Sequence, residues 1–171
     1  MGNRYDHAVT GFVSIVGAGP WDPDLLTLAA RDRLARADVV IADYLVNPAV
    51  LLHCRNDVLL FQRRRPRKGP VAPGTPPPRR TLDQAEVNAL LVEHGADKRV
   101  VRLKGGDPMI FGRGAEEAGA CRAAGIPFEF VPGVSSAIAT PVYAGIPVAH
   151  RDHSPAVCLV SGYEAYAKKG L

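Results

Sequence analysis

Residues 100–114 read Val-Val-Arg-Leu-Lys-Gly-Gly-Asp-Pro-Met-Ile-Phe-Gly-Arg-Gly, and this stretch decides the fold of the chain. Its first four residues are mostly β-branched or apolar, which predicts a short buried strand. Gly105 and Gly106 then let the backbone turn sharply and approach a ligand, while Pro108 prevents a helix from running through Asp107. Loops at the carboxyl ends of strands bind the ligands of open α/β sheets. An ordinary strand-to-helix connection would use the same residue types.

Apolar strands and helical stretches alternate along the rest of the chain. We expect strands at residues 12–16, 39–41, 58–61, 100–103 and 128–131. The expected helices are one from Pro23 to Ala37 capped by Asp22, a short one after Asn47, one opened by a capping box at Thr81–Gln84 and ended by Gly95, one at 115–124, and one from Ser135 or Ser136 to Tyr143. This alternation predicts an α/β fold with a mostly parallel, five-stranded sheet and helices on both faces.

The composition is that of a globular domain. The chain has 171 residues, of which 47% are hydrophobic and 22% charged. No apolar run approaches the ~20 residues that cross a bilayer, and residues 1–10 lack the apolar core of a signal peptide, so we expect a cytoplasmic protein with no membrane partner. Cys54, Cys121 and Cys158 are far apart and form no CxxC pair, which argues against a disulfide framework and a zinc site.

The positive charge of the chain is concentrated in one segment, residues 63–80. It holds seven basic side chains, six prolines and no acidic residue, and without it the net charge of +4 would become negative. Prolines disfavour helices and sheet interiors, so we expect a solvated, extended insertion. It is either a passive insertion or a basic flap that attracts an acidic substrate. Nucleic-acid binding is less favoured, because no aromatic residues are interleaved for stacking.

Two short motifs suggest other functions but are incomplete. Gly17-Ala-Gly19 begins like a dinucleotide-binding fingerprint, but Asp22 stands where the third glycine is needed, which argues against a nicotinamide cofactor. His150 and His153 lack a third metal ligand nearby, so residues 150–153 are interpreted as a linker and no metal is expected.

The segment Arg102–Gly114, RLKGGDPMIFGRG, resembles the signature of the tetrapyrrole methylases, and within them the uroporphyrinogen-III C-methyltransferases. The resemblance runs from about residue 12 to 162. Further motifs carry it in the right order: Val16–Pro20, Asp22–Thr27, Gly125–Pro127, Val131–Gly133 and Ala144–Pro147.

The resemblance implies S-adenosylmethionine-dependent C-methylation of uroporphyrinogen III to precorrin-2, on the way to sirohaem and cobalamin. It also implies a homodimer, a polycarboxylate tetrapyrrole as substrate and no nucleic-acid partner. The alternatives are a methylase of a later precorrin, or an inactive fragment that only binds tetrapyrrole or dimerises. Residues 11–150 would form the first domain and 156–171 the first strand of a truncated second one. A chain without the other wall of the cofactor cleft would self-associate and bind the cofactor weakly or not at all.

The resemblance also assigns site residues. Asp43 matches the proton acceptor of the family, and Arg63 aligns with its proton-donating lysine, for which Lys68 is a rival. Arg113 matches a substrate-binding arginine. Arginine stays protonated, so Arg63 suits carboxylate binding better than proton donation. Trp21 departs from the glycine of the family. The residues that match cofactor contacts are Pro20, Gly105, Gly106, Asp107, Ile110, Ser135 and Ser136.

Overall fold

In the computed structural model, residues 11–63 and 82–161 are described. Their centre is a five-stranded sheet in the order β3-β2-β4-β1-β5, in which every neighbouring pair is parallel. The strands are β1 (Phe12–Gly17), β2 (Val39–Ala42), β3 (Leu59–Gln62), β4 (Arg99–Lys104) and β5 (Phe128–Val131). The predicted α/β fold with a parallel five-stranded sheet is confirmed.

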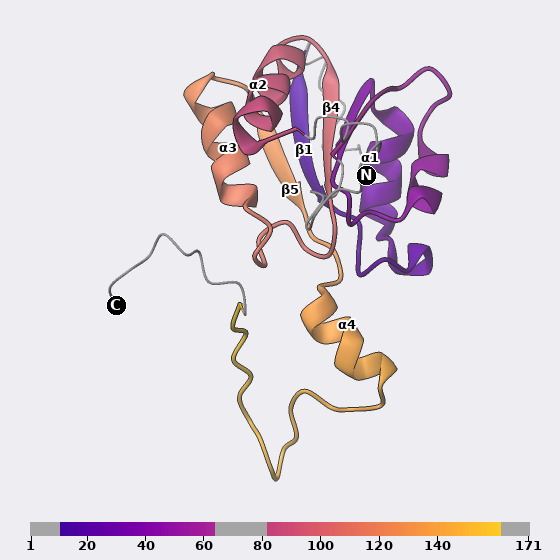
Figure 1. Ribbon diagram of the computed structural model, residues 1–171, viewed down its shortest axis with the longest axis vertical. Coiled ribbons are helices and arrows are strands. Elements are labelled where there is room, and N and C mark those ends of the chain that lie inside the picture. The colour runs from indigo at the N-terminus through magenta and orange to yellow at the C-terminus, as the bar shows by residue number, and fades with distance from the viewer. Residues whose placement is uncertain (1–10, 64–81, 162–171) are drawn as a thin grey trace, which may run out of the picture.

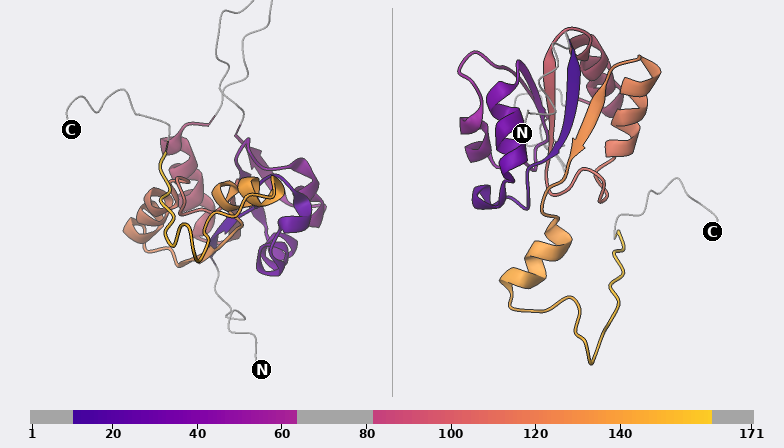
Figure 2. Two further views of the ribbon diagram at one scale, coloured as in Figure 1. Left: turned by 90° about the horizontal axis from the view of Figure 1, so that it is seen from below. Right: turned by 180° about the vertical axis from the view of Figure 1, so that it is seen from behind.

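Helices cover both faces of the sheet, as Figures 1 and 2 show. One face packs against α1 (Leu28–Arg36) and the 3₁₀ helix η2 (Pro48–His53), which contribute the buried Ala30, Leu34 and Val50. The other face packs against α2 (Gln84–Gly95) and α3 (Gly114–Ala123). The three central strands are buried on both sides and are mainly apolar, with Ser14, Arg102 and Lys104 as their buried polar residues.

The helix predicted from Pro23 to Ala37 is in fact two helices. Asp22 caps the short 3₁₀ helix η1 (Pro23–Leu25), as expected, but the chain is extended again at Leu26. Thr27 then caps α1, and its side-chain oxygen accepts from the Ala30 amide. The prediction missed this second cap because a threonine inside an apolar periodicity is equally compatible with a continuous helix.

The ends of α2 also differ from the sequence prediction. Its capping box is formed by Asp83 and Glu86, not by Thr81–Gln84. Gly95 is its last residue and has no left-handed conformation. A Cβ there would lie 2.7 Å from Cγ2 of Val13, so close packing against β1 requires this glycine, not a helix cap.

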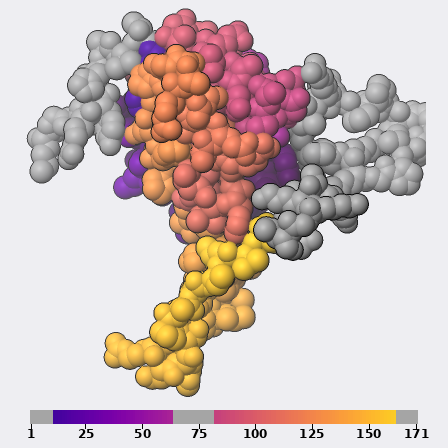
Figure 3. Space-filling view, turned by 90° about the vertical axis from the view of Figure 1, so that its left-hand side faces the viewer, coloured from indigo at the N-terminus to yellow at the C-terminus, as the bar shows by residue number. Residues whose placement is uncertain are grey.

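The last helix, α4 (Ser136–Tyr143), lies beyond the carboxyl ends of the strands and is capped by Ser135 (Figure 1). Its Tyr143 hydroxyl donates to Asp22, which ties α4 to the loop after β1. The segment that follows projects away from the α/β body (Figure 3). Residues 155–161 contain no strand in this structure. The assignment of 156–171 to a second domain stays a prediction, and residues 162–171 lie outside the described part.

Candidate functional site

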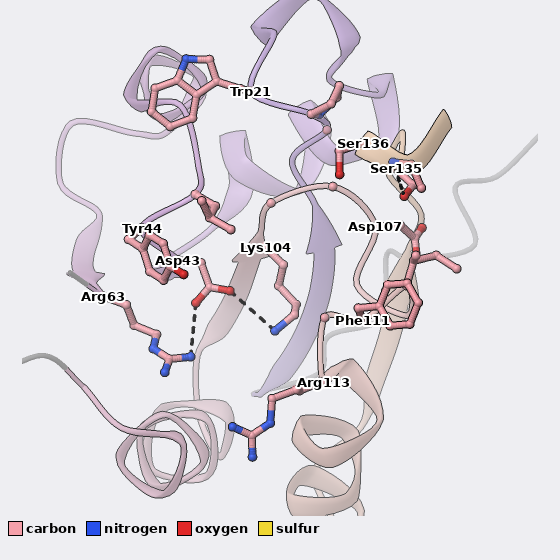
Figure 4. Close-up of a pocket in the computed structure, with 18 of the residues that line it drawn as sticks. Trp21, Asp43, Tyr44, Arg63, Lys104, Asp107, Phe111, Arg113, Ser135 and Ser136 are labelled. Atoms are coloured by element: carbon pink, nitrogen blue, oxygen red, sulfur yellow. Dashed lines mark hydrogen bonds and ion pairs between the residues drawn. The ribbon is translucent and has the colours of Figure 1, made fainter. Parts of the chain in front are cut away.

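A pocket of about 700 Å³ opens at the carboxyl ends of the strands (Figure 4). The loops after all five strands contribute to it, as expected where ligands bind to open α/β sheets. Every site residue predicted from the sequence lines this one pocket, although together they span more than a hundred positions of the chain: Pro20, Asp43, Arg63, Gly105, Gly106, Asp107, Ile110, Arg113, Ser135 and Ser136. Lys68 lies outside the described residues, as do the other basic side chains of the segment after Arg63.

Glycines hold the loops of the pocket together by backbone contact. Gly19 and Gly106 exchange two backbone hydrogen bonds, of 3.2 and 2.7 Å. A Cβ on Gly17 would lie 2.6 Å from the Gly106 carbonyl oxygen, and one on Gly133 would lie 2.3 Å from the same atom. The turns after β1, β4 and β5 therefore approach to distances that only glycine permits.

The two glycines of the loop after β4 differ in their hydrogen bonds. Gly106 adopts φ +66° and uses both its amide and its carbonyl in the bridge to Gly19. Gly105 lines the pocket, and among the described residues its amide and carbonyl take part in no hydrogen bond. A Cβ on Gly105 would lie 2.9 Å from Cβ of Leu45. Gly105 is thus the glycine whose backbone is available to a ligand.

The carboxylate of Asp107 is already engaged within the fold. One oxygen accepts from the Met109 amide at 2.8 Å and the other from the Gly133 amide at 3.1 Å. These bonds fix the loop after β4 against the loop after β5. Ser135 likewise caps α4 through the Ala137 amide. The Ser136 hydroxyl has no hydrogen-bond partner in the described part of the chain and lines the pocket, so it is the freer donor of the two serines.

Asp43 and Arg63 lie side by side at the ends of β2 and β3 (Figure 4). An Arg63 guanidinium nitrogen is 3.5 Å from Oδ1 of Asp43, and the Arg63 Nε donates to the Leu82 carbonyl at 3.0 Å. The two predicted catalytic residues are therefore an ion pair in contact with the pocket. The permanent positive charge of Arg63 faces both Asp43 and any anionic ligand.

Two charged residues of β4, Arg102 and Lys104, lie at this site and were missed by the sequence analysis. Lys104, the last residue of β4, is 2% exposed and donates to both oxygens of Glu117 at 3.0 and 2.9 Å. Its Nζ is 3.8 Å from Oδ2 of Asp43. The pKa of Lys104 lies below its ordinary value because burial disfavours the ammonium and because Arg102 is close. Charges at alternate positions of an otherwise apolar strand, Arg102 and Lys104, were the available signal.

Arg113 stands at the entrance of the pocket in a left-handed conformation, with φ +60°. Its guanidinium is half exposed and its Nε donates to Glu116 at 2.7 Å. It would have to exchange this partner for a substrate carboxylate. The apolar part of the pocket wall is also solvent-exposed, a typical property of ligand-binding surfaces; it is formed by Trp21, Tyr44, Leu45, Ile110 and Phe111.

Among residues 11–63 and 82–161, no group of three or more His, Cys, Asp or Glu side chains is arranged to hold a metal ion. Within the same residues no helix is both long and apolar enough to cross a membrane. His150 and His153 stack at 4.6 Å within a turn remote from the pocket lining.

Comparison with known proteins points to one family. The siroheme synthase of Pseudomonas paraeruginosa (strain DSM 24068 / PA7) is 48% identical over 160 residues, which are 92% of this chain and 32% of that protein. The siroheme synthase of Methylococcus capsulatus is 45% identical over 161 residues. The chain thus spans about a third of the length of the siroheme synthases it matches.

Solved structures agree with this relationship. The uroporphyrin-III C-methyltransferase of Thermus thermophilus superimposes with a TM-score of 0.65 at 41% identity, over 83% of this chain and 55% of that one. A structure of the Thermus thermophilus enzyme in complex with S-adenosylhomocysteine superimposes with a TM-score of 0.61 at 39% identity, over 82% of this chain and 51% of that one. A cobalt precorrin-4 methyltransferase superimposes with a TM-score of 0.66 at 28% identity, over 82% of this chain and 53% of that one.

The model of the tetrapyrrole (corrin/porphyrin) methylases matches residues 13–169, which include every helix, the whole pocket lining and every strand described above except Phe12, the first residue of β1. This chain therefore belongs to the tetrapyrrole methylase family.

Proposed function

We propose that this chain carries the methyl-transfer site of a uroporphyrinogen-III C-methyltransferase, which converts uroporphyrinogen III to precorrin-2 with S-adenosylmethionine as methyl donor. The observation that carries the proposal is the convergence of ten predicted residues on one pocket. The 41% identity to the Thermus thermophilus uroporphyrin-III C-methyltransferase supports it. The likeness to a cobalt precorrin-4 methyltransferase, at 28% identity, keeps methylation of a later precorrin as the second candidate.

The chemistry of the pocket fits the cofactor. The open amide and carbonyl of Gly105 and the Ser136 hydroxyl offer donors and an acceptor for an amino-acid moiety. The exposed side chains of Ile110 and Leu45 offer apolar surface. S-adenosylmethionine supplies an electrophilic methyl group, so the chain needs neither a metal nor its own nucleophile for the transfer.

The proton released after methylation of a pyrrole ring would pass to Asp43. Its Oδ1 accepts from Arg102 at 2.7 Å and faces Arg63. Its Oδ2 accepts no hydrogen bond among the described residues. Oδ2 is therefore the atom at which we place the proton. Arg63 and Arg113 would bind substrate carboxylates, for which the planar guanidinium is suited.

The assay is transfer of an isotopically labelled methyl group from S-adenosylmethionine into uroporphyrinogen III by the full chain, followed by mass spectrometry of the product. We expect successive methyl additions. Labelling of a later precorrin but not of uroporphyrinogen III would select the second candidate. If the chain alone is inactive, it should restore activity when it replaces the matching 160 residues of the Pseudomonas paraeruginosa siroheme synthase. An inactive chimera that is folded would contradict the proposal.

Asp43→Asn tests the proton acceptor, because asparagine keeps the shape but cannot accept the proton. Loss of a general base typically lowers turnover by about 10²–10⁴-fold. Binding of S-adenosylhomocysteine, measured by calorimetry, should persist. The matched control is Asp97→Asn, an exposed aspartate in the turn between α2 and β4, which should have no effect. Undiminished methyl transfer by Asp43→Asn would remove this residue from the mechanism. The homodimer and the cytoplasmic location expected from the sequence stay predictions.

A further inference from the structure

Behind the pocket lies a buried charge cluster, formed by Asp43, Arg102, Lys104 and Glu117. Arg102 and Glu117 are fully buried and Lys104 is 2% exposed. Arg102 and Lys104 occupy alternate positions of β4 and so point to the same face of the sheet, toward α3. Desolvating such ions costs several kcal/mol each, and buried ion pairs are weak evidence for stability. Stabilisation of the fold therefore does not by itself explain why these charges are buried here.

Glu117 is the anchor of the cluster. It is 0% exposed, and all its partners lie within the protein: Arg102 Nε at 2.9 Å, Lys104 Nζ at 2.9 and 3.0 Å, and Gln84 Nε2 at 3.2 Å. It cannot reach a ligand in the pocket. What it does is hold the Lys104 ammonium at the boundary between the core and the pocket, where Lys104 is also part of the lining.

The two oxygens of Asp43 have different environments because of this arrangement. Oδ1 accepts from Arg102 at 2.7 Å and is 3.5 Å from Arg63. Oδ2 lies 3.8 Å from Lys104 Nζ, which is too far for a hydrogen bond but close enough for a strong charge interaction (Figure 4). Arg102 thus fixes the orientation of the carboxylate, and Lys104 supplies charge beside Oδ2 without occupying it.

We infer that Lys104, held by Glu117, is a positioning residue that places a positive charge beside Asp43 and leaves its Oδ2 free to accept the proton. The inference rests on the proposed function for the identity of the proton donor. When the proton leaves the methylated pyrrole, the electrons of the broken bond return to the ring and the Asp43 carboxylate becomes a neutral acid. The nearby ammonium then favours release of this proton and return to the ionised form.

Charged and polar groups from several elements surround Asp43, and substitution of two of them, Lys104 and Glu117, should shift its titration in opposite directions. The surrounding groups are Arg63 after β3, Arg102 and Lys104 on β4, Glu117 with the more distant Glu116 on α3, and Gln84 on α2. Lys104→Met removes a cation beside Oδ2, so Asp43 should titrate at higher pH. Glu117→Gln removes the counter-ion of Lys104 and leaves Asp43 as the main carboxylate near this ammonium, so Asp43 should titrate at lower pH.

The experiment is a ¹³C NMR titration of the full chain labelled in its aspartate carboxyl carbons, with the Asp43 signal assigned by its loss in Asp43→Asn. We expect the midpoint to rise by about one pH unit in Lys104→Met and to fall in Glu117→Gln. Lys98→Met, just before the other end of β4, is the matched control and should shift nothing. Because this readout needs no substrate, it stands even if the chain methylates another tetrapyrrole.

A kinetic double-mutant cycle distinguishes positioning from a purely structural role. In the methyl-transfer assay Lys104→Met should lower kcat at least about tenfold, and should have little further effect in an Asp43→Asn background. Unchanged midpoints in both variants, or midpoints that move in the same direction, would overturn the inference. So would an equal loss of kcat in both backgrounds. If Lys104→Met does not fold, the fall of the midpoint in Glu117→Gln decides, and an unchanged midpoint there overturns the inference.

Discussion

Gly106 and Gly19 exchange both of their backbone hydrogen bonds, Gly106 N to Gly19 O at 2.7 Å and Gly19 N to Gly106 O at 3.2 Å. The bond pair joins the loop after β1 to the loop after β4, and the Asp107 carboxylate extends this connection to Gly133 after β5. Segments more than a hundred residues apart in the sequence thereby form one side of the pocket. The glycines of the sequence motifs serve first to let these loops meet.

Alanine substitutions should separate two reasons for glycine at these positions. Gly106 has φ +66°, but a Cβ there would meet no atom closer than 3.8 Å, so Gly106→Ala should cost only the backbone strain of about 1–2 kcal/mol. On Gly133 a Cβ would lie 2.3 Å from the Gly106 carbonyl oxygen, and backbone would have to move. Urea unfolding should therefore show a larger loss for Gly133→Ala.

Gly119, whose Cβ would meet nothing within 4 Å in the middle of α3, is the matched control. Gly119→Ala should leave stability unchanged or raise it, since alanine favours helix. Equal losses for Gly106→Ala and Gly133→Ala would contradict the contact distances.

Arg113 should affect substrate binding and not stability. Its partner Glu116 is three residues away on the surface, and such exposed ion pairs contribute little to folding. With a polycarboxylate substrate, Arg113→Ala should raise KM roughly tenfold at any salt concentration while the melting temperature stays the same. The measurement is steady-state methyl transfer at low and high ionic strength.

Arg122→Ala, at the other end of α3, is the control for loss of one surface arginine. If both variants raise KM equally and high salt abolishes the difference from the unsubstituted chain, Arg113 acts only through the general field of the protein and does not bind the substrate directly.

Thiol reactivity should report the packing of α3 against the sheet. Burial, together with the nearby charge of Glu117, raises the pKa of Cys121 to about 11, so at pH 8 its thiolate fraction is far below that of an ordinary thiol. Cys158 is exposed. With a disulfide reagent at pH 8, Cys158 should react at once and Cys121 only as the chain unfolds.

Cys158→Ser provides the control. In this variant the fast phase of the thiol reaction should vanish, and the slow phase should remain. A fast phase that persists in Cys158→Ser and maps to Cys121 would show that α3 opens readily and that the buried charge cluster is accessible to solvent.

The resemblance to the tetrapyrrole methylases assigned the site residues, and their positions at strand ends explain why the fold brings them together. Asp43, Arg63 and Gly105 each stand just past the carboxyl end of an apolar run, and parallel strands bring such positions to one edge. Lys104 escaped notice because a lysine that ends a strand is normally solvated, and only the tertiary position of Glu117 makes it buried. The split helix at Thr27 was missed for a similar reason, since both conformations satisfy the same periodicity.

Trp21 should be under backbone strain. It is a non-glycine residue with φ +83°, it is 54% exposed, and its carbonyl accepts from the Asn47 side chain at 2.8 Å. That hydrogen bond uses backbone and survives any substitution of the side chain. Glycine adopts positive φ without the cost of about 1–2 kcal/mol that other residues bear, although it loses up to about 1 kcal/mol through the entropy of the unfolded chain. Trp21→Gly should therefore be more stable than Trp21→Ala by about 1 kcal/mol.

Urea unfolding followed by circular dichroism is the measurement, because both substitutions remove the single tryptophan of the chain. Alanine is the matched comparison, since it also lacks the indole but keeps the Cβ that is strained at positive φ. If Trp21→Gly proved less stable than Trp21→Ala, the loop after β1 would not be held in this conformation, and Trp21 would not be fixed at the pocket wall. The predicted order instead implies that this residue is retained at the pocket at the expense of stability, as expected where strain accompanies ligand binding.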